Sequence, residues 1–237
     1  MIRKILPILF AVIFFAGCVY FSSPYRQLRP YFGGDDERVL VTDDDGTAFM
    51  IDRIPVTIGR YKECVDADQC YEPHYRNTYA KYYDKFIYEI FPVTFVSWKE
   101  ARAFCQAQGG NLPTVSQWML AAGGTDETDF AWGYDEPNFA RANYDGYYQS
   151  LTPAGWLPKG QSPLGILDLN GNVREWTLDL AKGSDNEMII KGGGAQDTLD
   201  DIRNEADFNH EWYSAGFNRG FRCVYPADPS ESASAQE

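Results

Sequence analysis

Cysteines constrain this 237-residue chain more than any other feature, because each disulfide closes a loop that the fold must accommodate. Cys18 ends an apolar N-terminal stretch, and four cysteines remain in the body of the chain: Cys64, Cys70, Cys105 and Cys223. An even number in an exported protein indicates two disulfides, with three possible pairings. Cys64 and Cys70 are near enough in sequence to close a small loop, which leaves Cys105 to join Cys223. Such a long bridge would tie the end of one closed domain to its middle.

The first residues of the chain predict export. Arg3 and Lys4 precede an apolar run from Ile5 to Ala16, which is too short for a comfortable membrane span and matches the core of a signal peptide. Two small residues stand directly before Cys18 and resemble the bacterial lipobox, in which the cysteine is lipidated and becomes the mature N-terminus. The alternative is an uncleaved anchor helix with an incidental cysteine.

The ends of the chain also indicate its domain organisation and location. We predict a signal peptide at 1–17, a tether at 18–37, one folded domain at 38–226 and a flexible tail at 227–237. Val19, in place of Asp, would direct a proteobacterial lipoprotein to the outer membrane. We therefore expect a periplasm-facing lipoprotein of the bacterial cell envelope, located at the outer membrane.

The charge of the chain limits its partners. It carries 34 Asp and Glu against 21 Lys and Arg, a formal net charge of −13, and losing Arg3 and Lys4 with the signal peptide lowers this to −15. Such a balance argues against nucleic acid and against direct docking on anionic lipid. We therefore expect no nucleic-acid partner, and contact with the membrane only through the lipid anchor.

Two short helices are predicted by capping boxes, in which an N-cap hydroxyl and a side chain three residues later bond each other's backbone N–H groups. Ser97 with Glu100 begins one helix, Thr114 with Gln117 begins the other, and a glycine pair ends each. Elsewhere Gly, Pro, Asn and Asp recur too often for long elements. The chain is therefore expected to contain little regular secondary structure.

A series of motifs spans Met50 to Tyr225. In order they are MIDRIPVTIGRYKECVDADQC, FPVTFVSWKEARAFCQAQGGNLPTVSQWMLAAGG, FAWG, ARAN, LGILDLNGNVREWTLD, IIKGGG and GFRC. This ordered series resembles the formylglycine-generating enzyme (sulfatase-modifying factor) family. The resemblance implies an α+β fold, the irregular domain of that family related to the C-type lectin fold. It also implies a disulfide between Cys105 and Cys223, in agreement with the pairing expected above.

The segment DLNGNVRE, from Asp168 to Glu175, is rich in side-chain oxygens. Its residues alone allow two interpretations: a tight turn at Asn170-Gly171, or a loop that holds a hard cation such as calcium. An EF-hand is excluded, because its sixth position requires Gly and Val173 stands there. The local sequence favours the turn, since turn dipeptides are far commoner than metal sites.

The family resemblance favours the cation loop and implies a structural calcium ion. Its ligands would be the side chains of Asp168 and Glu175 and the backbone carbonyls of Gly171 and Val173. A second, less complete calcium site would begin at Asn143 and Tyr144.

The copper chemistry of the best-known family members is not expected here. Those members use two cysteines to bind copper and convert a substrate Cys to formylglycine, and the matching positions are Asp197 and Ile202. Neither residue supplies the thiolate that copper(I) requires. An oxidation of another kind stays open, with candidates Asp197, Asp201, Arg203, Glu205 and Trp212. The alternative is that this segment is a solvated acidic loop.

These observations leave competing functions. The leading hypothesis is a non-catalytic, lipid-anchored envelope protein whose domain binds a protein or peptide, with acidic residues at 197, 200, 201 and 205 favouring a basic or amide-rich partner. The runner-up is a periplasmic oxidoreductase of the formylglycine-generating or siderophore-maturation type, acting without copper cysteines. A third is carbohydrate binding, suggested by the lectin-like fold and the high aromatic content.

Overall fold

The computed structural model describes residues 37–74, 81–123 and 128–227. The predicted signal peptide and Cys18 lie outside the described residues, as do the tether and the tail apart from one residue each. Within the described ranges, no helix is both long and apolar enough to cross a bilayer.

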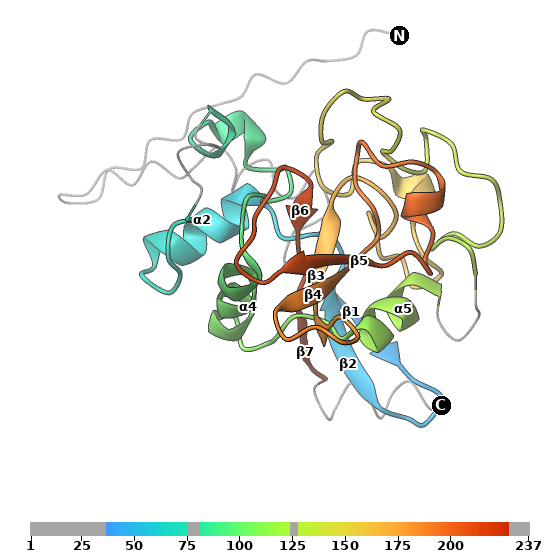
Figure 1. Cartoon of the computed structure of the whole chain (residues 1–237), viewed down its shortest axis with the longest axis horizontal. Helices are drawn as coiled ribbons and strands as arrows, with labels where there is room; N and C mark the ends of the chain where they lie inside the picture. Colours follow the sequence, from blue (N-terminus) through green and yellow to red (C-terminus); the bar gives the residue numbers. More distant parts are fainter. Residues whose placement is uncertain (1–36, 75–80, 124–127, 228–237) are drawn as a thin grey trace, which may run out of the picture.

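Two small sheets form the centre of the domain (Figure 1). The three-stranded sheet has the order β1 (Arg38–Thr42), β2 (Ala48–Asp52) and β7 (Val224–Pro226), and all its pairs are antiparallel. The four-stranded sheet has the order β5 (Phe208–Glu211), β4 (Glu187–Lys191), β3 (Arg174–Leu180) and β6 (Arg219–Gly220). In this sheet β3 and β6 run parallel, whereas β4 is antiparallel to both β3 and β5. The end of the chain contributes β6 to this sheet and β7 to the other.

Short helices flank the sheets. α2 (Ile58–Asp66) and α4 (Trp98–Ala107) lie to one side and α5 (Val115–Gly123) to the other (Figure 1). Within the described ranges, three single-turn 3₁₀ helices occur in the loops: η2 (Phe86–Tyr88), η3 (Pro158–Gly160) and η4 (Asp200–Ile202). Both predicted capping boxes are confirmed, since Ser97 and Glu100 bond reciprocally before α4, and Thr114 and Gln117 do so before α5.

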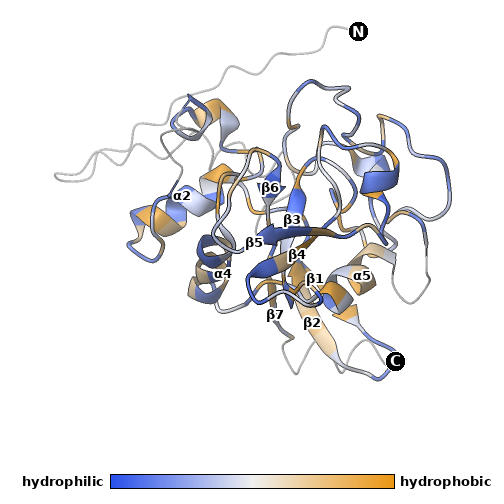
Figure 2. Ribbon diagram, in the orientation of Figure 1, coloured by the Kyte–Doolittle hydropathy of each residue, from blue (hydrophilic) through white to orange (hydrophobic). Residues whose placement is uncertain are grey.

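The core has two main parts, which follow the two sides of the sheets. Trp176 of β3 packs among residues of α2, α4 and the end of the chain, such as Phe104 and Phe221. Trp118 of α5 packs against β1 and β2 through residues such as Ile51. Figure 2 shows hydrophobic colouring on β1, β2 and α5 and on parts of α2, with mostly hydrophilic loops around them. The domain is thus an α+β fold with little regular structure.

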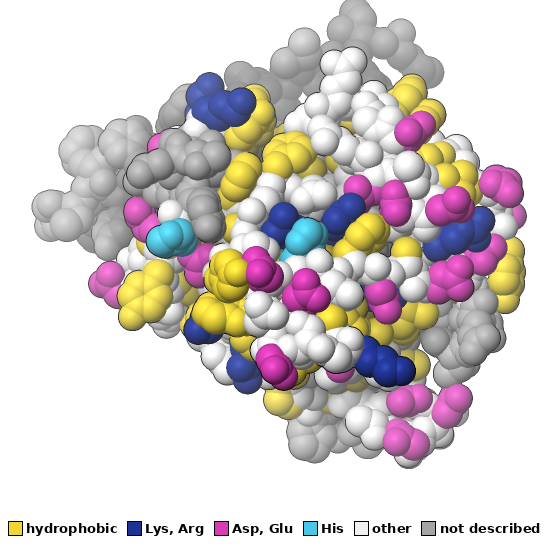
Figure 3. All heavy atoms as spheres, viewed as in Figure 1, with side chains coloured by type: hydrophobic (Ala, Val, Ile, Leu, Met, Phe, Trp, Pro, Cys, Tyr) yellow, Lys and Arg dark blue, Asp and Glu magenta, His cyan; other side chains and the backbone are white. Residues whose placement is uncertain are grey.

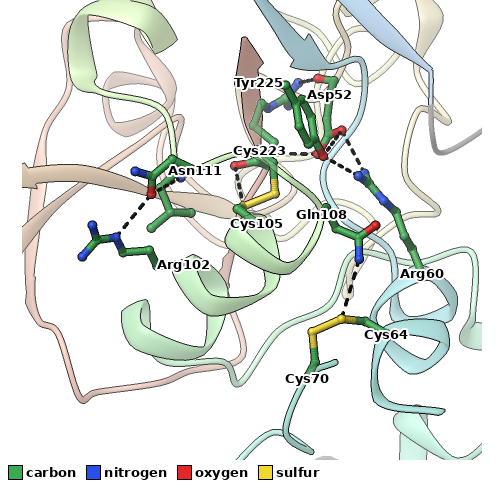
Figure 4. Close-up of a disulfide and its surroundings, with 12 residues drawn as sticks. Asp52, Arg60, Cys64, Cys70, Arg102, Cys105, Gln108, Asn111, Cys223 and Tyr225 are labelled. Carbon is green, nitrogen blue, oxygen red and sulfur yellow. Dashed lines mark hydrogen bonds and ion pairs between the residues drawn. A yellow bond between two sulfur atoms is a disulfide. The ribbon is translucent and has the colours of Figure 1, made fainter. Parts of the chain in front are cut away.

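Both expected disulfides are present (Figure 4). Cys64 and Cys70 close a small loop after α2, and Cys105 of α4 joins Cys223 beside β7 across a sequence separation of 118 residues. The long bridge fastens α4 to the strand that completes the three-stranded sheet. It therefore links the two sides of the domain.

Candidate functional site

The two positions that match the copper cysteines of the family are occupied by groups already engaged in the fold. The carboxylate of Asp197 accepts two hydrogen bonds of 2.7 Å from Arg174 and a third from the backbone N–H of Gly194. Ile202 is fully buried and packs with Phe130 and other apolar residues. An ion pair and a core side chain therefore stand where a thiolate pair would be required.

The acidic segment after Asp197 is not a free negative surface. Asp201 accepts bonds from the backbone N–H and the hydroxyl of Thr198, and these bonds lower the pKa of its carboxyl. Asp200 pairs with Arg203. These internal bonds partly offset the negative charge of the segment, and its attraction for a basic partner stays a prediction. Glu205 is exposed.

The structure also separates the residues proposed for an alternative oxidation. Arg203 pairs with Asp129, and its guanidinium lies 5.2 Å from the ring centroid of Phe130. Trp212 instead contacts Lys99 at the start of α4. Arg203 and Trp212 therefore contact different parts of the domain.

The carboxylate of Glu175 is held by Arg222 rather than left open for a cation. Its Oε1 accepts a 2.7 Å bond from Nη2 of Arg222, while Oε2 accepts bonds from Nε of Arg222 and from the indole of Trp118. Both charged side chains are 0 % exposed. The guanidinium already compensates the charge, so Glu175 does not fit as a calcium ligand.

Asp168 lies near this ion pair, at the start of the loop. Its Oδ2 accepts a 2.7 Å bond from the backbone N–H of Gly155. Burial raises the pKa of Asp168 to about 6, against the lowering effects of that bond and of the charge on Arg222. The loop itself contains the expected turn, because Gly171 has a φ of +84°. A Cβ there would lie 2.4 Å from the carbonyl oxygen of Asn143.

The two segments predicted to hold calcium are in direct contact with each other. Asn143 accepts a backbone bond from Asn172, and its amide nitrogen donates to Oδ1 of Asn172. The side-chain oxygen of Asn143 is buried and has no partner among the described residues, so its chemistry fits a cation ligand. Tyr144 packs on Phe139. No group of three or more His, Cys, Asp or Glu among the described residues could hold a metal ion, and calcium stays a prediction.

A groove of about 440 Å³ opens between α4 and the four-stranded sheet. It is lined by Trp98, Lys99, Arg102, Leu178, Leu180, Met188 and Trp212. Trp98 is fixed by its indole, which donates a 2.7 Å bond to the carbonyl of Thr177, and by its backbone N–H, which bonds the carbonyl of Trp212. Leu180 is 53 % exposed, which is high for a large apolar side chain on a strand.

Two cations border this groove. Nζ of Lys99 lies 3.7 Å from the ring centroid of Trp212, and the guanidinium of Arg102 lies 5.2 Å from that of Trp98. Among the residues that the structure describes, no carboxylate pairs with either one, and Arg102 donates only to Asn111. Figure 3 shows hydrophobic side chains beside α4 and β4 with both basic and acidic side chains around them. On an acidic protein, the groove is therefore apolar with a positive border.

A second hollow, of about 550 Å³, lies beside the small-loop disulfide. Arg60 borders it and is bonded to Asp52 and to the hydroxyl of Tyr225 (Figure 4). Burial raises the pKa of Tyr225 to about 12. Because its principal charge is already bonded internally, this hollow is a weaker binding candidate than the groove.

The sequence reasoning missed the groove because its wall comes from distant segments. Trp98 was not among the candidate site residues, and Trp212 was assigned to a different cleft. One signal was available: Trp176, Leu178 and Leu180 alternate along β3 and share one face. That face begins in the core at Trp176 and ends exposed at Leu180.

Comparison with known proteins identifies the family. The model of the sulfatase-modifying factor enzyme 1-like domain matches residues 26–227, most of the chain. The chain belongs to this family. It is 34 % identical over 152 residues to the inactive C-alpha-formylglycine-generating enzyme 2 of Bos taurus, covering 56 % of this chain and 50 % of that protein.

Other members of the sulfatase-modifying factor family show the same similarity. The formylglycine-generating enzyme of Mycobacterium tuberculosis is 36 % identical over 174 residues, covering 58 % of each chain. The chain thus spans about half the length of the curated relatives it matches. The solved structure of PvdO from Pseudomonas aeruginosa superposes with a TM-score of 0.60 at 16 % identity, covering 80 % of this chain and 90 % of that one. This likeness confirms the fold.

Proposed function

We propose that this domain is a non-catalytic binding module, held in the bacterial cell envelope by lipid on Cys18. Its ligand would be a segment of a partner protein that carries a large apolar anchor and acidic flanking residues. The observation that carries this proposal is the groove, because it combines open apolar surface with two cations that have no carboxylate partner among the described residues.

The chemistry of the groove supports such a ligand. Aromatic and aliphatic anchors that fill a pocket supply most of the energy of a typical interface. The indole of Trp98 and the side chains of Leu178 and Met188 provide the apolar floor for an anchor. Lys99 and Arg102 at the border would then attract acidic groups and set the orientation of the segment.

The positions of Asp197 and Ile202 support the non-catalytic part of the proposal. Asp197 is bonded to Arg174, Ile202 is in the core, and the four cysteines of the domain are used in disulfides. A family relative that shares about a third of its aligned residues carries the name of an inactive enzyme. The competing oxidoreductase would need a reactive group at positions 197 and 202. Neither Asp197, which is bonded to Arg174, nor the buried Ile202 supplies one.

A binding experiment with defined peptides tests the proposal. Labelled peptides with a Leu-Trp centre are prepared with Glu, Gln or Lys flanks, and binding is measured by fluorescence anisotropy. We expect the Glu-flanked peptide to bind best. The double variant Lys99→Glu with Arg102→Glu should weaken it by about tenfold or more, the effect of losing about 1.4 kcal/mol.

Matched variants make the outcome specific. Lys159→Glu reverses an exposed cation in η3 that does not line the groove, and it should leave binding unchanged. Trp212→Ala should weaken the binding of every peptide, because it removes an apolar side chain that lines the groove. Equal binding of Glu-flanked and Lys-flanked peptides, or full binding by the double variant, would overturn the proposal.

A further inference from the structure

Two arginines lie opposite each other on the parallel strands β3 and β6. Arg174 and Arg219 are paired in the register of these strands, so their side chains leave the same face of the sheet about 5 Å apart. Like charges directly opposite each other destabilise a sheet. The guanidinium of Arg174 lies 3.7 Å from the ring centroid of Phe208, and His210 stands two residues further along β5 on the same face. Burial and the charges of Arg219 and Arg174 lower the pKa of its imidazole. Figure 3 shows a histidine flanked by basic side chains in this part of the surface.

Only one of the two arginines is neutralised. Arg174 forms the two-bond ion pair with Asp197. Arg219 pairs with no carboxylate among the described residues, and Nη1 donates a 2.8 Å bond to the hydroxyl of Ser214. Its Nε is buried and has no acceptor in the part of the chain that the structure describes. Burial lowers the pKa of Arg219, and the positive charge of Arg174 lowers it further.

The guanidinium of Arg219 is also held in position. A Cβ on Gly216 would lie 3.0 Å from Nη2 and 3.2 Å from Nε, so a larger residue would displace the charged group. The carbonyl of Gly216 accepts bonds from the backbone N–H groups of Phe95 and Arg219. These two bonds hold the backbone at Gly216 in place beside the Arg219 side chain. A fixed donor loses little freedom when a ligand binds.

We propose that Arg219, together with His210 and the unused N–H groups of Arg174, forms a binding site for an oxyanion. A guanidinium presents a planar fork that matches a carboxylate or a phosphate through two parallel bonds. A ligand oxyanion would offset the repulsion between the two arginines. This site does not depend on the peptide groove, although Trp212 of the groove follows His210 by two residues.

Histidine NMR provides a direct test, since the chain contains only two histidines. Ring signals of His210 are followed at constant pH and ionic strength while chloride is replaced by inorganic phosphate, by sulfate or by acetate. We expect a saturable shift of the His210 signals with at least one oxyanion and no shift of the His74 signals. A shift with phosphate or sulfate but not with acetate would indicate a site for a tetrahedral anion, and the reverse result would indicate a site for a carboxylate.

Two variants separate recognition from general charge. Arg219→Gln should weaken the binding of the preferred oxyanion by about tenfold or more, as expected when a charge-assisted pair of hydrogen bonds is lost. Arg219→Lys keeps the charge but not the fork and should give an intermediate loss. Arg219→Gln should also melt no lower than the wild-type protein, because it removes uncompensated repulsion. His210 signals that respond to no oxyanion, or respond equally in Arg219→Gln, would overturn the proposal.

Discussion

Replacing Arg222 by Met should destabilise the domain severely, because it leaves a buried charge without compensation. Glu175 and Arg222 are 0 % exposed, and after the substitution the carboxylate would retain only the indole of Trp118. The carbonyls of Asp52 and Leu167 would also lose their guanidinium donors. Breaking a buried pair by removing one partner costs about 3–5 kcal/mol. That is a large part of the roughly 5–15 kcal/mol that stabilises a typical domain.

Urea unfolding followed by tryptophan fluorescence measures this cost. At about 2–4 °C per kcal/mol for a domain of this size, the loss also corresponds to a melting temperature lower by roughly 6–20 °C. The matched control is Arg141→Met, since Arg141 pairs with Asp135 at the same 2.7 Å distance but on the surface. Exposed pairs contribute only about 0–1 kcal/mol, so this variant should unfold almost as the wild type does.

The same measurements decide whether Glu175 has a second role. In the observed geometry, Glu175→Gln destabilises the protein equally with calcium or with a chelator. The double variant Glu175→Leu with Arg222→Met costs less than the two single losses added together, because neither charge is then left alone. A chelator that destabilises the wild type but not Glu175→Gln would refute this reasoning and make Glu175 a calcium ligand.

Three further predictions concern the rest of the chain. Cys105→Ala with Cys223→Ala should lower the free energy of unfolding by about 5 kcal/mol, against about 2 for the small-loop bridge, in urea unfolding, because the long bridge closes a much larger loop. Burial and the charges of Arg219 and Arg174 lower the pKa of His210, so its contribution to stability is present above its ordinary pKa and is lost as the pH falls through the lowered value. The urea midpoint should therefore fall on acidification, and less so in His210→Gln. Mass spectrometry of the native protein should find an acylated Cys18 as the first residue, and an unmodified Cys18 would contradict the lipoprotein prediction.

Local features of the sequence predicted the parts of the structure that depend on neighbouring residues. The capping boxes at Ser97 and Thr114 gave correct helix starts, because each involves residues three positions apart. The loss of copper ligands at Asp197 and Ile202 followed from residue types alone. The bridge from Cys105 to Cys223 was also correctly paired, since few pairings were possible.

Features that depend on distant partners could not be predicted. Asp197 was treated as a free acid because the sequence shows its charge but not Arg174, which lies 23 residues away. Glu175 was treated as a metal ligand, and its partner Arg222 lies 47 residues away. Charges are counted easily from sequence, whereas their neutralisation depends on which strands become adjacent.

The bridge between Cys105 and Cys223 makes a covalent ring of most of the domain. A single backbone cut anywhere within the 118 residues it spans would leave both pieces attached to each other. The pieces would also remain at high effective concentration, so their packed contacts could re-form. A nicked molecule would therefore migrate as one chain until its disulfides are reduced, and a protease could make such a cut in this domain without releasing a fragment.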